Sequence, residues 1–252
     1  EQNRLLVTTE LRRALERGEL RVHYQPQIAI GDGHLVGIEA LVRWQHPERG
    51  LVYPAAFIPI AEDYELVMLL GEWVLREACQ QAQDWYRRGL PMAPMAVNFS
   101  AVQFRQRNII AKVAQVLADT GLPAELLEIE LTESAIMHSG SDTTEVLDNL
   151  RRLGIRLAID DFGTGYSSLQ HLRHFSIDKL KIDRSFIADL PRDDNAAAIV
   201  RAMVMLGRSL GLEVVAEGVE TRQQWEFLRT LECGSFQGFY QTAPLDAPSF
   251  EV

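Results

Sequence analysis

Cysteine is scarce in this chain, whose 252 residues contain only Cys79 and Cys233. No CxxC pair or disulfide framework is present, which excludes a disulfide-stapled secreted fold and favours a reducing compartment. We interpret both cysteines as small core residues. The sequence also lacks an apolar run long enough to span a membrane, and no signal peptide opens it. We therefore expect a cytoplasmic domain with no membrane segment in this chain.

Basic residues are outnumbered, with 25 Lys and Arg against 35 Asp and Glu and a net charge of −10. This balance argues against nonspecific binding of duplex nucleic acid, which needs a basic surface. A phosphate substrate stays compatible with it if metal ions supply local positive charge. The six histidines are scattered without an HExxH pair, and no Ser-His-Asp arrangement is evident. Gly163-Thr164-Gly165 lacks the third glycine of a dinucleotide-binding loop.

The length of the chain is close to the roughly 250 residues of a single (β/α)8 barrel. A hydrophobic content of 47% is ample for one large core. The chain begins with Glu1 rather than Met. We therefore expect residues 1–252 to form one barrel domain of a longer multidomain protein. Regulatory domains, and a membrane anchor of that parent protein, would lie outside this sequence.

Hydrophobic patterning predicts how strands and helices follow one another. Residues 20–30 and 34–44 flank Gly31-Asp32-Gly33, which is typical of an antiparallel hairpin. Further strands are expected near residues 95–99, 126–131, 155–159, 179–182, 213–216 and 235–237, and helices near residues 9–17, 54–61, 66–85, 109–117, 167–172 and 221–231. This alternation predicts an α/β fold with a mainly parallel sheet. About eight strands indicate a closed, TIM-like barrel with one antiparallel departure in the first hairpin.

The stretch from Ile155 to Gly165 organises the chain. An apolar strand ends in Asp160 and Asp161, and a glycine-containing loop follows at once. Adjacent strand residues point to opposite faces, but a turn at Asp161 would bring both carboxylates to one site. Two cations sharing a carboxylate would explain the pair. A turn in which the aspartates cap backbone amides explains it equally well when the stretch is taken alone.

Polar residues also follow the other predicted strands at their carboxyl ends. They are Glu39, Asn98, Glu130, Asp160, Asp161, Lys181, Glu217 and Gln237. The carboxyl ends of barrel strands meet at one mouth, where the active sites of this fold lie. The acidic and amide members offer only oxygen ligands, which favours magnesium or manganese over zinc. Packing of a hydrophobic core does not by itself require polar residues at the ends of successive strands.

Each of these residues has an ordinary structural alternative. Asn98 could cap a helix that begins near Ser100, and Glu130 could be solvated. Glu133 or Glu217 could occupy the first turn of a helix, where a carboxylate is favoured. Lys181 could pair with a neighbouring aspartate. Individually these alternatives are as good as a functional role, but together they leave the shared position at strand ends unexplained.

Glu39-Ala40-Leu41, followed by Val42-Arg43, resembles the name-giving motif of the EAL domain, the family of cyclic-di-GMP phosphodiesterases. Other segments are similar to family motifs in the family order: residues 24–26 (YQP), 57–62 (FIPIAE), 98–100 (NFS), 130–133 (ELTE), 160–169 (DDFGTGYSSL), 179–183 (KLKID), 216–220 (AEGVE) and 237–238 (QG). Together they cover nearly the whole chain. The resemblance implies a modified (β/α)8 barrel with one antiparallel strand.

The resemblance also implies a role for each matching residue. The implied metal ligands are Glu39, Asn98, Glu130, Asp160 and Asp161. They would hold two divalent cations, Mg²⁺ or Mn²⁺, and Ca²⁺ is expected to bind without supporting catalysis. Lys181 and Glu217 would position and deprotonate water, with Glu39 as a further catalytic residue.

The remaining implied roles concern substrate and loop. Gln25, Leu41, Arg43 and Gln237 would contact substrate. Glu133 would anchor the loop from residue 162 to residue 168, and the resemblance suggests a homodimer near that loop. The sequence departs from the family pattern at Asp63-Tyr64-Glu65, where a glycine is usual, and at Ala243, where an arginine is frequent. Both departures bear on substrate affinity more than on chemistry.

The function that the resemblance implies is hydrolysis of cyclic di-GMP to linear pGpG by water attack assisted by two metal ions. One alternative is a catalytically weak or inactive receptor module for cyclic di-GMP, although such receptors typically have eroded metal ligands. A weaker alternative is a metal-dependent barrel enzyme that acts on carboxylates, since strand-end carboxylates and a lysine also suit enolate chemistry.

Overall fold

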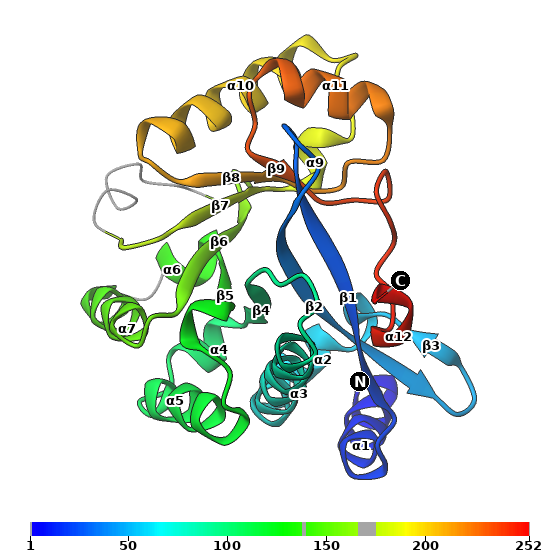
Figure 1. The fold of residues 1–252 in the computed structure, drawn as a ribbon. Coiled ribbons are helices and arrows are strands. Elements are labelled where there is room, and N and C mark those ends of the chain that lie inside the picture. Colours follow the sequence, from blue (N-terminus) through cyan, green and yellow to red (C-terminus); the bar gives the residue numbers. More distant parts are fainter. Residues whose placement is uncertain (1, 138–139, 166–174, 252) are drawn as a thin grey trace.

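The computed structural model describes residues 2–137, 140–165 and 175–251 (Figure 1). Its strands follow one another in a single sheet, in the order β1-β9-β8-β7-β6-β5-β4-β2-β3. Their bounds are Leu20–Ala29 (β1), Leu35–His46 (β2), Gly50–Val52 (β3), Met95–Phe99 (β4), Leu127–Thr132 (β5), Arg156–Phe162 (β6), Lys179–Ile182 (β7), Glu213–Ala216 (β8) and Ser235–Phe236 (β9). A further pairing between β1 and β2 closes the sheet into a barrel, with β3 attached outside it.

Strand β1 is the antiparallel member of the barrel. It runs antiparallel to both of its neighbours, β2 and β9, whereas the pairs from β2–β4 round to β8–β9 are parallel. The hairpin turn contains Gly33, whose φ of +77° is a left-handed conformation that glycine adopts without strain. The predicted barrel and its antiparallel first hairpin are therefore confirmed.

Helices surround the sheet on its outer side (Figure 1). They are α1 (Gln2–Arg17), α2 (Ile58–Asp63), α3 (Val67–Arg87), α4 (Ala101–Phe104), α5 (Ile109–Thr120), α6 (Glu133–Met137), α7 (Gly140–Arg152), α9 (Arg184–Ile187), α10 (Asp194–Ser209), α11 (Arg222–Thr230) and α12 (Ala247–Phe250). Among the residues that the structure describes, no helix combines the length and the apolar character that crossing a membrane requires. The helix predicted over 167–172 lies outside the described residues.

One predicted helix is divided into two shorter segments in the structure, so that prediction was wrong. Residues 54–61 were expected to form a single short helix, but the structure has a 3-10 turn over Pro54–Ala56 and then α2 from Ile58. Pro59 explains the break, because a proline has no N–H to donate and fits only the first turn of a helix. Its presence therefore requires a new helix start at residue 58.

Capping residues at two helix starts and an apolar face on a third helix account for α11, α10 and α3. Thr221 and Gln224 form a reciprocal capping box at the start of α11, as predicted. Asp193 caps α10 through the amides of Asn195 and Ala196. In α3, the apolar face from Leu70 to Trp85 is buried against the barrel. Burying this face, at about 25 cal/mol per Å² of apolar surface, is what holds the helix on the sheet.

Candidate active site

Lys181 lies at the centre of a group of carboxylates inside the barrel. Its ammonium Nζ is 2.6 Å from Glu130 Oε2, 2.7 Å from Glu217 Oε1, 3.3 Å from Asp160 Oδ1 and 3.6 Å from Glu39 Oε2. The lysine and Glu130 are fully buried. These residues come from β7, β5, β6, β2 and the end of β8, so barrel closure is what brings them together.

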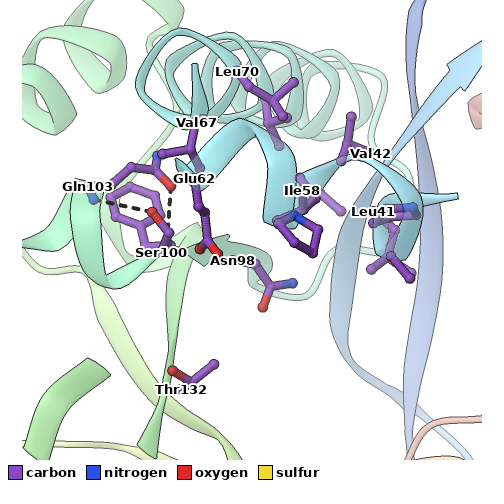
Figure 2. Close-up of a pocket in the computed structure, with 17 residues that line it drawn as sticks. Leu41, Val42, Ile58, Glu62, Val67, Leu70, Asn98, Ser100, Gln103 and Thr132 are labelled. Carbon is purple, nitrogen blue, oxygen red and sulfur yellow. Dashed lines mark hydrogen bonds between the residues drawn. The ribbon is translucent and has the colours of Figure 1, made fainter. Parts of the chain in front are cut away.

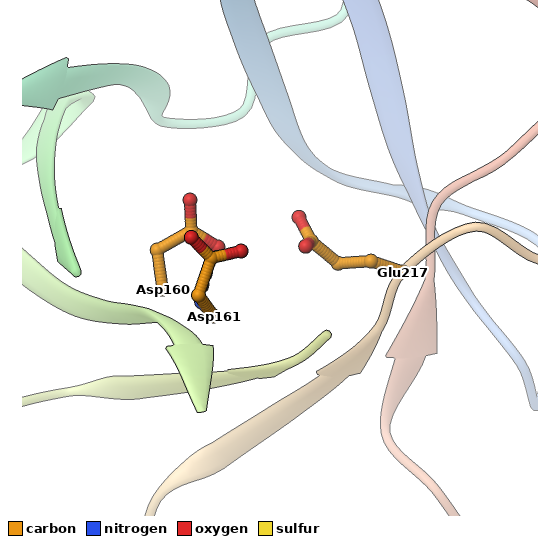
Figure 3. A group of neighbouring side chains, drawn as sticks. All are labelled: Asp160, Asp161 and Glu217. Carbon is orange, nitrogen blue, oxygen red and sulfur yellow. Dashed lines mark hydrogen bonds between the residues drawn. The ribbon is translucent and has the colours of Figure 1, made fainter. Parts of the chain in front are cut away.

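Asp160 and Asp161 present both carboxylates to one place. The pairing of β6 with β7 shifts between Ile159 and Phe162, which is a β-bulge, and Asp161 has a left-handed φ of +53°. One oxygen from each aspartate and one from Glu217 all lie within 4.8 Å of one another. Figure 3 shows Glu217 pointing across the mouth toward the two aspartates. A turn was expected at Asp161, and the structure instead has an irregularity within β6 that brings both carboxylates to one site.

Glu39 is held in place by amide side chains. Asn98 donates from Nδ2 to Glu39 Oε1 at 2.7 Å, and Gln237 donates from Nε2 to Glu39 Oε2. Gln237 also donates to Gln25 Oε1 at 2.8 Å, and Gln25 donates to the Thr242 carbonyl at 3.0 Å. The predicted residues Gln25, Glu39, Asn98 and Gln237 therefore form one hydrogen-bonded network.

The protonation of the site reflects burial and crowding of like charges. Burial, with Asp160 and Glu39 nearby, raises the pKa of Glu217 to about 8 despite Lys181. Burial, with Asp160 and Asp183 nearby, raises the pKa of Asp161 to about 6. Burial alone would lower the pKa of Lys181, but the surrounding carboxylates raise it well above its usual value. The lysine is therefore a fixed cation.

Glu39 and Glu130 respond in opposite directions to the same surroundings. Burial raises the pKa of Glu130 well above its usual value, and Glu39 and Asp160 add to the effect. Burial acts on Glu39 in the same direction, but Lys181, Gln237 and Asn98 together lower the pKa of Glu39. The difference follows from hydrogen bonding, since both oxygens of Glu39 accept bonds from amides.

The residues of the mouth fit divalent cations. Glu130 Oε1 and Gln237 Oε1 are buried without a hydrogen-bond partner, and such orphaned acceptors are costly unless a ligand completes them. Four carboxylates lie within 3.6 Å of the Lys181 ammonium, and Asp161 lies beside two of them, so full ionisation would leave an excess of negative charge. Oxygen donors of this kind select hard cations such as Mg²⁺ and Mn²⁺.

The residues predicted to contact substrate do not all face the same space. Gln25, Leu41 and Gln237 line a cleft of about 330 Å³ beside Asp160, Asp161 and Glu217. Arg43 does not line this cleft: it is buried, donates to the Val42 carbonyl at 2.8 Å and lies 5.1 Å from the ring centre of Tyr53. The structure thus separates Arg43 from the other three.

Sequence reasoning missed part of the cleft wall. Asp183, Arg184 and the exposed Phe239 line it together with the predicted residues. Asp183 and Arg184 directly follow β7, so their position at a strand end was a usable signal. Phe239 follows Gly238 in the turn after β9, and no periodicity marks it.

Glu133 contacts the start of the loop that follows Asp161. Its Oε2 accepts a hydrogen bond from the Gly163 amide at 2.8 Å, and the side chain is buried. A Cβ atom added at Gly165 would lie 2.9 Å from Glu133 Oε1, so the loop passes closely over this carboxylate. The far end of the predicted loop, including Ser168, lies outside the described residues.

The ordinary alternatives for several residues do not hold. Ser100, not Asn98, caps α4 through Gln103, which leaves the Asn98 side chain on Glu39. Glu130 is buried rather than solvated, and Lys181 pairs with carboxylates of other strands rather than with Asp183. Glu133 does begin α6, as its alternative proposed, while also bonding Gly163.

An apolar pocket of about 380 Å³ adjoins the mouth (Figure 2). It lies between the middle of β2, α2, α3 and the end of β4, and Leu41, Ile58, Pro59 and Leu70 contribute to its wall. Asn98 borders it, and Leu41 borders both this pocket and the carboxylate cleft. The two hollows therefore share Leu41 as a wall residue.

Comparison with known proteins gives relatives over the whole domain. The chain is 45% identical over 246 residues to the bifunctional diguanylate cyclase/cyclic di-GMP phosphodiesterase MucR of Pseudomonas aeruginosa, covering 98% of this chain and 36% of MucR. It is 43% identical over 247 residues to the cyclic di-GMP phosphodiesterase NbdA of the same organism, covering 98% of this chain and 32% of NbdA. The chain thus spans about a third of the length of these relatives.

Solved structures agree with the barrel. A structure described as the PaMucR phosphodiesterase in complex with c-di-GMP is 44% identical, with a TM-score of 0.95, and the match covers 97% of this chain and 99% of that chain. The EAL domain of Mycobacterium smegmatis DcpA is 34% identical, with a TM-score of 0.78 and coverage of 93% and 95%. The EAL domain family matches residues 8–244. On this sequence match, with the barrel and its mouth as described, the chain belongs to the EAL domain family.

Proposed function

We propose that this domain hydrolyses cyclic di-GMP to linear pGpG with the help of two divalent cations, Mg²⁺ or Mn²⁺. The observation that carries the proposal is the group formed by Asp160, Asp161 and Glu217, whose oxygens lie within 4.8 Å of one another beside Lys181. Two relatives at 43–45% identity are named cyclic di-GMP phosphodiesterases, which supports this substrate.

The proposed ligands divide between two cation positions. Glu39, Asn98, Glu130 and Asp160 would hold the first cation, and Asp160 and Asp161 would hold the second. Bound divalent cations lower the pKa of coordinated water and neutralise charge on phosphoryl and leaving oxygens. The unpaired Glu130 Oε1 supports this division, because it is a buried acceptor that a cation would complete.

Lys181 and Glu217 would manage the proton of the attacking water. Glu217 would take that proton as the water oxygen bonds to phosphorus, and the bound cations, with Lys181 beside it, would favour its ionised form beforehand. The bond from phosphorus to the ribose 3′-oxygen then breaks, and the proton returns to that oxygen. Lys181 is a permanent cation 2.7 Å from Glu217 and would hold its carboxylate in position.

Substrate would occupy the cleft and the apolar pocket together. Gln25 and Gln237 would bind polar groups of the substrate next to the phosphates, and Leu41, which borders both hollows, would pack against it. A planar guanine suits the apolar pocket shown in Figure 2. Arg43 would reach a phosphate only after leaving Tyr53.

We also propose that residues 1–252 act as one domain of a longer cytoplasmic or membrane-anchored protein, alongside regulatory domains, and that the domain forms a homodimer. The relatives are about three times as long as the matched segment, which supports additional domains. Size-exclusion chromatography with light scattering would test the dimer, and a monomeric mass at micromolar concentration would reject it.

The activity is tested by incubating the purified domain with cyclic di-GMP and resolving products by chromatography and mass spectrometry. We expect pGpG with Mg²⁺ or Mn²⁺, and none with Ca²⁺ or with a chelator. Asp161→Asn serves as the matched control, since it keeps the shape of the side chain and removes its charge. Absence of product at saturating Mg²⁺ and Mn²⁺ would reject the proposal, and tight binding without turnover would favour a receptor.

A further inference from the structure

A second buried ion pair lies in the barrel below Lys181. Lys179 Nζ is 2.6 Å from Glu128 Oε1 and 2.8 Å from Gln27 Oε1. Lys179 is 1% exposed, and Glu128 and Gln27 are 0% exposed. None of these residues lines the carboxylate cleft or the apolar pocket. The proposed chemistry therefore uses none of them.

The pair belongs to a longer series that we call the lower polar chain. Its members are Gln27 (β1), Lys179 (β7), Glu128 (β5), Arg156 (β6) and Glu213 (β8). Arg156 Nε lies 3.4 Å from Glu128 Oε2, and its Nη2 lies 2.7 Å from Glu213 Oε1. Successive contacts therefore link five strands, from the closed interior outward to the exposed Glu213.

The lower polar chain is in register with the active-site residues. Lys179 precedes Lys181 by two residues on β7, Glu128 precedes Glu130 by two on β5, and Gln27 follows Gln25 by two on β1. Residues two apart on a strand point to the same face. The two Lys–Glu pairs are thus stacked, each joining β5 to β7 across β6 with a contact of 2.6 Å.

Stability alone does not explain such a pair. Replacing a buried ion pair by well-packed apolar residues is often neutral or stabilising, because desolvation of both charges is costly. Hydrogen bonding around the pair is also incomplete, since Gln27 Nε2 is buried without a hydrogen-bond partner. A Cβ atom at Gly37 would lie 2.3 Å from Gln27 Oε1, so the neighbouring strand leaves room for this polar group.

We infer that Lys179 and Glu128 are positioning residues that fix β5 and β7 relative to each other, so that Lys181 meets Glu130 and Glu217 at the distances the reaction needs. The inference rests on the proposed function. Loss of a hydrogen-bonded partner behind a metal site typically costs about 10–100-fold in activity or metal affinity. An effect of this size is expected although neither residue touches the substrate.

The test compares a variant that removes both charges of the Lys179–Glu128 pair with Glu128 variants that keep or remove the hydrogen-bond acceptor for Lys179. Lys179→Met/Glu128→Met replaces both charges by apolar side chains of similar size, and we expect it to fold, with kcat reduced about 10–100-fold and KM nearly unchanged. Its affinity for Mn²⁺, measured by calorimetry, should fall by a similar factor. Glu128→Gln keeps an acceptor for Lys179 and should retain more activity than Glu128→Leu. Leu180→Val, on the same strand, controls for lost stability and should keep wild-type kcat.

The outcomes separate the inference from the proposed function. Wild-type kcat and Mn²⁺ affinity in a folded Lys179→Met/Glu128→Met variant would overturn the inference. If that variant does not fold, equal activities of Glu128→Gln and Glu128→Leu would overturn it instead. If the wild-type domain turns over no cyclic di-GMP, the proposed function fails, and the Mn²⁺ affinities of the same variants still decide the inference.

Discussion

Asp161 follows Asp160 directly in the chain, yet the two carboxylates lie together because Asp161 adopts a left-handed φ of +53°. In a continuous strand they would point to opposite faces of the barrel wall. The bulge that separates Ile159 from Phe162 in the pairing with β7 supplies the extra residue. The site therefore depends on a backbone conformation that a non-glycine residue adopts at a cost.

That cost can be measured by substitution at residue 161. Asp161→Gly and Asp161→Ala both remove the carboxylate, but only alanine retains the Cβ atom that disfavours a left-handed conformation. We expect the glycine variant to be more stable than the alanine variant by about 1 kcal/mol in urea unfolding without metal. Equal stabilities would show that residue 161 is not left-handed in solution.

The stability of the metal-free domain should fall as pH rises from about 5.5 to 8.5. The folded-state pKa values of Glu217 and Asp161, about 8 and 6, lie above the usual 4.5 and 3.8. Between these limits the folded state holds protons that the unfolded chain has released, so the stabilisation is complete at low pH and lost as pH passes the folded-state pKa values.

Urea unfolding in a chelator across this pH range measures the effect. Glu217→Gln should flatten the profile near pH 8, and saturating Mg²⁺ should reduce the slope because bound cations displace the same protons. A stability that rises from pH 5.5 to 8.5 in the metal-free wild type would contradict the assigned pKa directions.

Glu39→Ala should destabilise the metal-free domain as well as abolish turnover. Removing one of several crowded carboxylates relieves charge repulsion, but the lost hydrogen bonds outweigh this gain, because Asn98 and Gln237 donate to Glu39 and its pKa is lowered. Donors left without an acceptor cost about 1–3 kcal/mol. Thermal unfolding of Glu39→Ala against Glu39→Gln measures this, and a gain in stability for the alanine variant would contradict the prediction.

The strand-end residues could be predicted because parallel strands of a barrel converge at their carboxyl ends. Glu39, Glu130 and Asp160 were identified in this way, and the structure brings them together around Lys181. The expected strand end at Glu39 was wrong, however, because β2 continues from Leu35 to His46. Which carboxylate meets which nitrogen could not be predicted, since those partners come from strands that only barrel closure places face to face. The structure likewise separates Arg43 from the cleft, which a strand-end position does not indicate.

The lower polar chain was missed for a different reason. Lys179 and Glu128 lie two positions before Lys181 and Glu130, so the pattern of strand-end residues does not include them. Their spacing from Lys181 and Glu130 was nevertheless readable, because a period of two places both lysines on one face of β7 and both glutamates on one face of β5. Lysine is almost never fully buried without a partner, so two lysines on the inner face of a barrel strand imply acidic partners on neighbouring strands.

Glu133→Ala should lower kcat by about 10–100-fold although Glu133 is predicted to touch neither substrate nor metal. Its carboxylate fixes the Gly163 amide, two residues after Asp161, and so restrains the turn that carries a proposed ligand. Glu133→Gln can still accept that hydrogen bond and should be less impaired. Steady-state kinetics of both variants decide the point, and full activity of Glu133→Ala would remove the anchoring role.

Lys181 and Glu217 should affect catalysis, whereas Arg43 should affect binding. Lys181→Met and Glu217→Gln remove groups that act on the attacking water, so we expect kcat to fall about 10²–10⁴-fold with little change in nucleotide affinity. Arg43→Ala should raise Kd with a smaller effect on kcat, because the phosphate contact that Arg43 would make after leaving Tyr53 would already form in the ground state. The measurements are kcat with Mg²⁺ and Kd by calorimetry with Ca²⁺.

Because Lys181 contacts four carboxylates, its variant must first be shown to be folded by circular dichroism. Weakened affinity with unchanged kcat in the Lys181 and Glu217 variants would make both residues binders and end the water-activation role.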